Sequence, residues 1–236
     1  MPLKSWLRTA LRRRESNNRG ALEQQGFHSD AYLLSLVDAF APRVSRFVET
    51  GTNLGSTARY IAEKHPALEI FTCEIDADAF ASAHRVLSHY PQAHPYHLPS
   101  DAFLQELHRS HPQVFTQTSL FWLDAHSYGF RWPLEFELAF ITEHAPSAIV
   151  MIDDFEVPGE PGFKYFKHGR KTCGMALLRE SVSAKRSDYK MVLPTYRERT
   201  SDRHALVGVG TLLVGEDAAP GLELPAGFRF ADPSSL

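Results

Sequence analysis

Short apolar runs alternate with segments of helical periodicity along most of this chain. The apolar runs are residues 46–49, 68–73, 93–98, 119–123 and 148–152, and the helical segments between them are 57–64, 77–90, 101–110 and 133–143. Apolar strands that alternate with helices are typical of a parallel sheet covered by helices on both faces. The pattern therefore predicts an α/β fold with a doubly wound sheet.

The alternation changes near the end of the chain. Residues 175–183 have a helical pattern, and two strand patterns, 189–193 and 205–214, then follow each other across a polar loop. Two strands without a helix between them are expected to pair antiparallel. We therefore predict a mostly parallel sheet of seven strands that ends in a C-terminal antiparallel hairpin.

The 236 residues suit one domain with appendages. We predict an N-terminal basic helix and linker over residues 1–28, the α/β domain over 29–217 and an irregular tail over 218–236. In the first segment, basic residues interleave with apolar residues that fall on one helical face, namely Leu3, Trp6, Leu7 and Leu11. Such a helix either binds a membrane surface or a partner, or packs loosely on its own domain, and the sequence leaves both open.

Composition argues against several classes of protein. Hydrophobic residues make up 43% of the chain and charged residues 22%, as in ordinary globular proteins, and the formal net charge is −3. This charge does not favour a nucleic-acid partner, and no apolar stretch reaches the roughly 18 residues of a transmembrane helix. Cys73 and Cys173 are too few for a disulfide scaffold, so a cytoplasmic location fits best. The sequence leaves a homo-oligomer open.

The strongest motif lies between the first apolar strand and the next helix. It reads Glu49-Thr50-Gly51-Thr52-Asn53-Leu54-Gly55-Ser56-Thr57. In open parallel sheets, ligands bind beyond the carboxyl ends of the strands, where glycine lets the backbone approach a ligand and a helix start offers free N–H groups. The alternative is a tight turn in which glycine serves packing alone.

An acidic residue follows at the spacing expected of a ribose site. The second strand ends in Glu74, 23 residues (74 − 51) after Gly51, and a carboxylate there can accept hydrogen bonds from both ribose hydroxyls. The further glycines of the dinucleotide fingerprint G-x-G-x-x-G are missing, which argues against NAD. The spacing therefore favours an adenosyl-type cofactor.

The pattern Glu-x-Gly-x-x-x-Gly with an acidic end to the second strand resembles the class I S-adenosylmethionine-dependent methyltransferases and their Rossmann-like fold. The resemblance covers about residues 47–214 and includes the terminal hairpin. It implies that Glu49 lies near the amino acid part of S-adenosylmethionine (SAM), that Glu74 holds the ribose and that Ser100-Asp101 meets the adenine. The implied cofactor-binding residues are Glu49, Gly51, Thr52, Asn53, Gly55, Ser56, Thr57, Glu74, Ser100, Asp101 and Asp124.

Three carboxylates follow the fourth and fifth strands. Asp124 comes after the fourth strand, and Asp153 and Asp154 come after the fifth. In a parallel sheet all three face one crevice, where they repel one another unless they are protonated or bind a cation. Oxygen ligands suit Mg²⁺. The alternative is that the carboxylates cap loops or contact the amino group of the cofactor.

This layout resembles the metal-dependent O-methyltransferases of the catechol and caffeoyl-coenzyme A type and the macrolide-sugar methyltransferases. The resemblance implies a divalent cation, Mg²⁺, which Asp124, Asp153 and Asp154 hold and which lowers the pKa of a substrate hydroxyl. The sequence departs from the catechol enzymes in two ways. Asp154 stands where they have asparagine, and residues 124–128 hold no equivalent of their catalytic lysine.

The catalytic base can be assigned only by its chemistry. His126 is the candidate base, because its ordinary pKa is about 6.5, and Asp124 is the candidate catalytic partner beside it. The alternative is that His126 only orients Asp124 or packs under the loop.

The segment 156–174 follows the fifth strand and is rich in aromatic and basic residues. We expect it to overhang the site as a lid that receives an anionic part of the substrate, although a solvated loop would have the same composition. Taken together, these patterns predict a SAM-dependent methyltransferase that acts on a hydroxyl of a small molecule, such as a sugar or natural-product intermediate. The competing hypothesis is a non-catalytic cofactor- or ligand-binding domain on the same fold.

Overall fold

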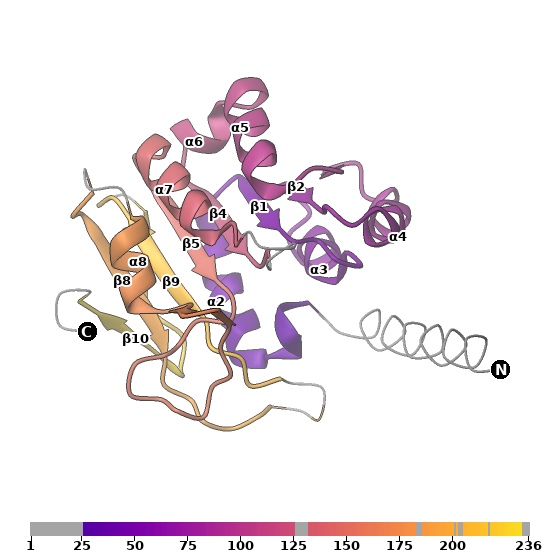
Figure 1. The fold of residues 1–236 in the computed structure, drawn as a ribbon. Coiled ribbons are helices and arrows are strands. Elements are labelled where there is room, and N and C mark those ends of the chain that lie inside the picture. The colour runs from indigo at the N-terminus through magenta and orange to yellow at the C-terminus, as the bar shows by residue number, and fades with distance from the viewer. Residues whose placement is uncertain are drawn as a thin grey trace.

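The computed structural model describes residues 26–125, 132–182, 186–200, 202, 205–216 and 218–232. Figure 1 shows a large twisted sheet with helices on both of its faces. Its eight strands stand in the order β10-β8-β9-β5-β4-β1-β2-β3. The strands are β1 (Arg46–Thr50), β2 (Glu69–Cys73), β3 (Ala93–Tyr96), β4 (Ser119–Leu123), β5 (Ala148–Ile152), β8 (Tyr189–Pro194), β9 (Gly210–Val214) and β10 (Phe228–Ala231).

The first five strands form the parallel half of the sheet, as the alternating pattern predicts. Thr50, the last residue of β1, stands opposite the last residues of β2 and β4, and the last residues of β4 and β5 also pair. Because the strands end in register, the loops that follow them begin at one edge. Gly51, Glu74, Asp124 and Asp153 are the first residues of these loops.

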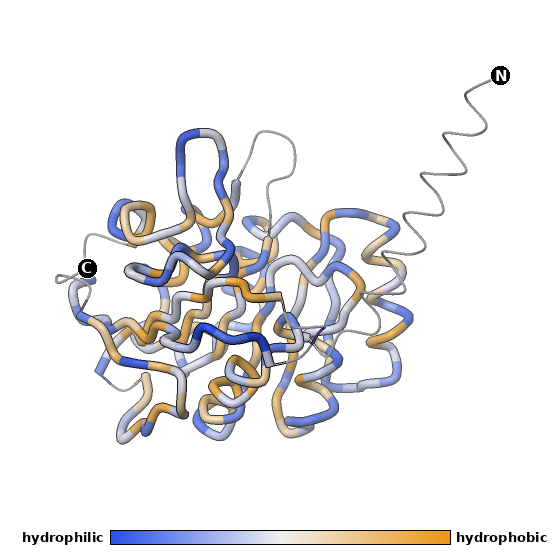
Figure 2. The backbone as a smooth tube through the Cα atoms, turned by 90° about the horizontal axis from the view of Figure 1, so that it is seen from below, coloured by the Kyte–Doolittle hydropathy of each residue, from blue (hydrophilic) through white to orange (hydrophobic). Residues whose placement is uncertain are grey.

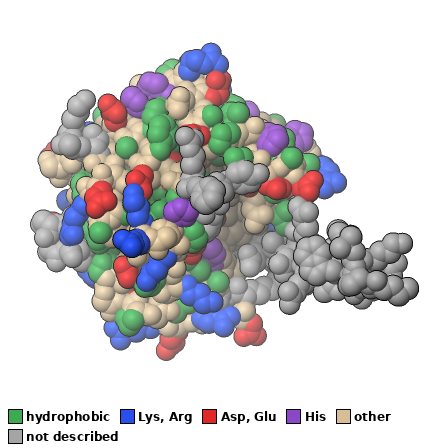
Figure 3. Space-filling view, in the orientation of Figure 1, with side chains coloured by type: hydrophobic (Ala, Val, Ile, Leu, Met, Phe, Trp, Pro, Cys, Tyr) green, Lys and Arg blue, Asp and Glu red, His purple; other side chains and the backbone are tan. Residues whose placement is uncertain are grey.

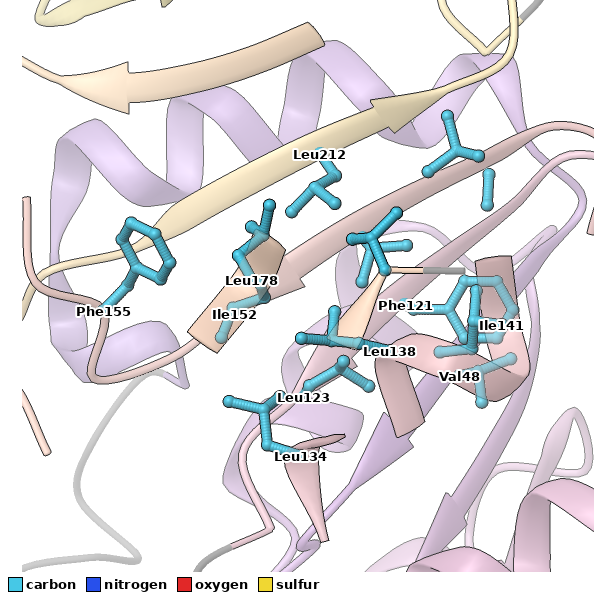
Figure 4. Packing of buried hydrophobic residues seen from close by; sticks show 14 of the residues in the cluster. Val48, Phe121, Leu123, Leu134, Leu138, Ile141, Ile152, Phe155, Leu178 and Leu212 are labelled. Carbon is cyan, nitrogen blue, oxygen red and sulfur yellow. The ribbon is translucent and has the colours of Figure 1, made fainter. Parts of the chain in front are cut away.

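Helices cover the two faces and bury a separate apolar cluster on each. The first face carries α2 (Ala31–Phe40), α3 (Ser56–Lys64) and α4 (Ala77–Leu87), and the second carries α5 (Ser100–Ser110), α6 (Gln113–Thr116), α7 (Leu134–His144) and α8 (Met175–Ser181). Figure 4 shows residues of the second cluster, and Figure 2 shows hydrophobic residues on both helical coils and inner segments, with hydrophilic residues in many outer loops. No described helix is long and apolar enough to cross a membrane.

The strands β4 and β5 show why both faces need helices. Every residue of these two strands is buried, so their uninterrupted apolar sequences fit strands that are covered on both sides. On the second face, Leu138 of α7 and Leu178 of α8 pack toward them (Figure 4). Asp30 then fixes where α2 begins, because its carboxylate accepts hydrogen bonds from the backbone N–H groups of Tyr32 and Leu33.

The C-terminal strands confirm the hairpin and add a strand that the sequence analysis did not predict. The strand β9 pairs antiparallel with both β5 and β8. The predicted irregular tail contains β10, which pairs antiparallel with β8, so the sheet has eight strands rather than seven. Phe228 of β10 packs against Tyr196, with ring centroids 5.6 Å apart. This strand has only four residues and is flanked by glycine and proline, so the sequence pattern did not indicate a strand here.

The described chain begins with a turn that the sequence analysis assigned to the linker. Phe27–Ser29 forms the short 3₁₀ turn η1, and Phe27 is buried in the first apolar cluster. The α/β domain therefore starts at or before Gly26 rather than at residue 29. The predicted basic helix of residues 1–14 lies outside the described residues.

Candidate functional site

A cavity of about 990 Å³ opens at the carboxyl edge of the parallel strands. The loops after β1 to β5 line it, together with the turn at residues 26–28. Its size is in the range of small-molecule and cofactor sites. Most of the residues predicted to bind the cofactor line it, namely Gly51, Thr52, Asn53, Ser56, Thr57, Glu74, Ser100, Asp101 and Asp124, and so do Asp153 and Asp154.

The loop after β1, residues 51–55 (the glycine loop), requires glycine at position 51 for two separate reasons. Gly51 has φ = 86°, in the left-handed region that favours glycine. A Cβ atom at this position would also lie 2.5 Å from the backbone oxygen of Asp124, so the loops after β1 and β4 are in direct contact. The backbone N–H groups of Gly51 and Thr52 both donate to the carbonyl oxygen of Cys73, which joins the same loop to the end of β2.

Glu74 is held by the backbone around it. Its Oε2 accepts a hydrogen bond from the N–H of Asn53 at 2.8 Å, and its Oε1 accepts from the N–H groups of Ile75 and Asp76, each at 2.8 Å. The half-buried carboxylate thus bridges the glycine loop and the start of α4. A carboxylate offers about four lone-pair positions, so one position, on Oε2, remains for a hydroxyl donor from a ligand.

Two of the predicted cofactor residues lie behind the loop and do not line the cavity. Glu49 is 1% exposed and accepts a hydrogen bond from the hydroxyl of Thr72 at 2.5 Å. Burial raises the pKa of Glu49 to about 8, so this carboxyl group is mostly protonated at neutral pH. Gly55 directly precedes α3 as its N-cap, with φ = 84°, and a Cβ atom on it would lie 3.4 Å from Cα of Ala83 in α4. Both residues therefore support the loop from the protein side.

The loop after β3 brings Ser100 and Asp101 to the cavity, at the start of α5. Behind them lies Glu137 of α7, which is fully buried. Burial raises the pKa of Glu137 to about 7, although the neighbouring hydroxyls of Ser100 and Thr50 lower it. Within the described residues, no hydrogen bond of good geometry reaches either carboxyl oxygen of Glu137.

The carboxylates after β4 and β5 meet a histidine that the sequence analysis placed in the linker. Nε2 of His28 lies 2.7 Å from Oδ1 of Asp153. Asp153 is almost wholly buried, with 2% of its side chain exposed, whereas 23% of the His28 side chain is exposed. Asp153 also shares a hydrogen bond with the carboxyl group of Asp124.

This arrangement determines the charges of the three groups. Burial and the negative charge of Asp153 raise the pKa of Asp124 well above its usual value. Burial also opposes ionisation of Asp153, but the attraction of His28 outweighs it and lowers the pKa of Asp153. For His28, burial lowers the pKa and the charge of Asp153 raises it, with a net increase. These shifts favour the charged forms of His28 and Asp153 and the protonated form of Asp124.

Comparison of the sequence with protein-family models and with curated proteins gives no match. Solved structures, however, share the fold. TomG from Streptomyces achromogenes, an O-methyltransferase involved in tomaymycin synthesis and solved with SAM, has a TM-score of 0.52 at 18% identity over 78% of each chain. The O-methyltransferase from Bacillus cereus in complex with S-adenosylhomocysteine (SAH) has a TM-score of 0.53 at 15% identity, over 78% of this chain and 79% of that one.

A third structure agrees over a longer part of the chain. Cofactor-bound Rv0187 from MTB has a TM-score of 0.55 at 15% identity, over 87% of this chain and 89% of that one. The chain has the fold of the class I methyltransferases. At these identities the likeness establishes the fold, and the roles of individual residues follow from their own geometry.

The carboxylates of this methyltransferase fold do not fit the predicted Mg²⁺ centre. Within the described residues, no three His, Cys, Asp or Glu side chains are arranged to hold a metal ion. Oδ1 of Asp153 is engaged by His28, and Asp124 and Asp153 share a hydrogen bond. The sequence analysis expected a cation to relieve the repulsion. In the structure, Asp153 instead pairs with His28 and shares a hydrogen bond with Asp124.

His28 escaped the sequence analysis because nothing local indicates its role. It lies 125 residues from Asp153 in the sequence, and it reaches the site only through an unusual backbone. Phe27, His28 and Ser29 all have positive φ angles, of 42°, 58° and 55°. This conformation costs about 1–2 kcal/mol for each residue other than glycine. His126, the predicted base, lies outside the described residues.

The segment 156–174 forms a small hairpin at the rim of the cavity. Its strands are β6 (Lys167–His168) and β7 (Lys171–Thr172). Phe166 packs edge-on against Trp132, a lining residue, and Lys171 lies 2.5 Å from the carboxylate of Glu135, another lining residue. The segment therefore contacts two lining residues, but none of residues 156–174 lines the cavity itself, and a lid over the site stays a prediction.

Replacing Glu137 with glutamine should stabilise the protein at pH 8 but not at pH 5. A buried carboxyl group whose pKa rises from 4.5 to about 7 stabilises the fold below about pH 4.5, and this contribution is lost as pH rises to about 7. The difference corresponds to about 3 kcal/mol and to a shift of several degrees in melting temperature. Thermal melts at both pH values measure it.

The control for this experiment is Glu143→Gln, which removes an exposed carboxylate from the same helix. This variant should melt like the wild type at both pH values. If Glu137→Gln and the wild type show the same pH dependence of melting, Glu137 does not titrate in this range.

Proposed function

We propose that this chain is a SAM-dependent methyltransferase that transfers a methyl group to a hydroxyl oxygen of a small molecule. The observation that carries the proposal is that one cavity joins two different sites. Glu74 and the glycine loop lie at the cofactor end, and His28 with Asp153 lies among the lining residues contributed by β4, β5 and the N-terminal turn. A cofactor and a second molecule can therefore meet in one space.

The residues at the cofactor end fit an adenosyl group. Glu74 would accept a hydrogen bond from a ribose hydroxyl, and Gly51, Thr52 and Asn53 of the glycine loop would line the rest of the cofactor. Asp101 and the first turn of α5 would meet the adenine ring. The cofactor supplies a methyl group on a positively charged sulfur, so the role of the protein is mainly to position the methyl acceptor.

The rim of the cavity favours a small acceptor with an anionic part. Trp132 and Phe136 supply apolar lining, and Phe136 is 37% exposed. Figure 3 shows Lys and Arg side chains on the lower part of the molecule, where Figure 1 places the long loops after β5 and β8. Lys164, Lys167 and Arg170 of the first loop are exposed. They support a carboxylate or phosphate on the substrate, because such groups pair with basic side chains.

We expect methyl transfer to persist in excess EDTA. The reason is that the carboxylate of Asp153 is already paired with His28 and hydrogen-bonded to Asp124, whereas a cation needs free carboxylate oxygens as ligands. The assay is transfer of labelled methyl from SAM to a panel of phenols and sugars, with and without a carboxylate or phosphate.

The outcomes of this assay separate the hypotheses. Transfer that is lost in EDTA and restored by Mg²⁺ would show that the three aspartates rearrange around a metal ion, and it would reject the metal-free mechanism. Binding of SAM without transfer to any acceptor in the panel would favour a non-catalytic binding domain.

A further inference from the structure

We infer that His28, held by Asp153, receives the proton of the acceptor hydroxyl during methyl transfer. This inference rests on the proposed function and assigns its proton acceptor to the N-terminal turn. The sequence alone indicates a different base, His126, in the loop after β4.

The first support is the geometry of the imidazole. Nε2 of His28 is bonded to Asp153 at 2.7 Å, so the carboxylate fixes this nitrogen as the one that carries the proton. Nδ1 is the other ring nitrogen, and the side chain lines the cavity with 23% of its surface exposed. A neutral His28 therefore offers Nδ1 as a hydrogen-bond acceptor to a molecule in the cavity.

The second support is the way the turn is anchored. The ring of Phe27 packs edge-on against Trp122 and Phe47, with centroid distances of 4.9 Å and 6.2 Å. A Cβ atom on Gly26 would lie 2.9 Å from Cα of Thr57, so the turn lies directly on the start of α3. This packing holds three successive left-handed residues, and such backbone outliers tend to cluster at functional sites.

The chemistry balances with these groups. A bond forms between the acceptor oxygen and the methyl carbon, and the carbon–sulfur bond breaks with its electron pair left on sulfur. The hydroxyl proton passes to Nδ1 of His28, and the negative charge of Asp153 stabilises the imidazolium that results. The proton then leaves to solvent through the exposed side of the ring.

The surroundings of His28 determine the pH range in which it acts. The carboxyl groups that face His28 are Asp153 and Asp154 after β5 and Asp30 before α2. Burial lowers the pKa of His28, but the negative charges of these groups, above all that of Asp153, raise it above its usual value. The neutral form therefore becomes more abundant as pH rises through a value above 6.5. We expect kcat to rise over the same range.

The test compares His28→Gln with His65→Gln. His65 forms a similar pair with Asp38, at 3.0 Å, outside the cavity. With the best acceptor of the phenol and sugar panel, His28→Gln should lower kcat at least about 100-fold and abolish its rise with pH. Calorimetric SAM affinity should stay near the wild-type value, and His65→Gln should keep full activity.

A second measurement does not depend on an acceptor. Imidazole NMR of the full chain should show His28 as the Nε2-protonated tautomer when neutral, and Asp153→Asn should abolish this preference. Wild-type kcat in His28→Gln, an equal loss in both histidine variants, or a neutral His28 protonated on Nδ1 would overturn the inference. Failure of the wild type to bind SAM would instead reject the proposed function.

Discussion

Glutamine in place of Glu74 should weaken SAM binding about 100-fold. The carboxylate accepts hydrogen bonds from three backbone N–H groups and, in the proposed complex, from a ribose hydroxyl. The amide nitrogen of glutamine would face an N–H donor, so the loop would shift and the hydroxyl would lose a charged acceptor. Hydrogen bonds to charged groups contribute about 1.5–3 kcal/mol each, and about 1.4 kcal/mol corresponds to a factor of ten.

The matched control for Glu74→Gln is Glu69→Gln. Glu69 is the first residue of β2, the strand that Glu74 follows, and it pairs with Arg46 at 3.2 Å. Calorimetry should show wild-type affinity for this variant. Equal SAM affinities in Glu74→Gln and the wild type would mean that the ribose is held elsewhere.

Alanine in place of Gly51 should destabilise the fold by at least about 2 kcal/mol and abolish SAM binding. The positive φ angle alone costs about 1–2 kcal/mol for a residue with a Cβ atom. The new atom would also lie 2.5 Å from the backbone oxygen of Asp124, and a backbone atom cannot move aside as a flexible side chain can. For a chain of this size, melting should fall by roughly 4 °C or more.

Gly159→Ala separates the two causes. Gly159 has a similar φ angle of 80°, but a Cβ atom there would meet nothing within 4 Å. This variant should lose only the part due to φ and should bind SAM normally. If both alanine variants melt alike, the contact between the loops after β1 and β4 does not constrain Gly51.

The parallel half of the sheet and one edge of the site could be predicted from the sequence. Uninterrupted apolar runs indicate strands covered on both faces, and parallel strands bring their carboxyl ends together. This reasoning correctly placed Gly51, Glu74, Asp124 and Asp153 around one cavity. It could not decide which loop residues face the ligand, so Glu49 was expected at the cofactor but lies behind the loop.

The contribution of the N-terminal turn could not be predicted. Its left-handed backbone is favoured by tertiary packing of Phe27 and not by the local sequence, which contains only one glycine, Gly26. The sequence analysis identified the correct physical problem, three carboxylates in one crevice, and inferred a metal ion as the counter-charge. In the structure, Asp153 pairs with His28 and shares a hydrogen bond with Asp124.

The most direct test of the account is whether the purified chain binds one adenosyl cofactor. Native mass spectrometry with added SAH should show one bound molecule per chain, and added NAD should not displace it. The Glu74→Gln variant should lose the adduct at the same concentration. A folded wild-type chain that binds no SAH, or that binds NAD in preference, would contradict the assignment of the cavity to SAM.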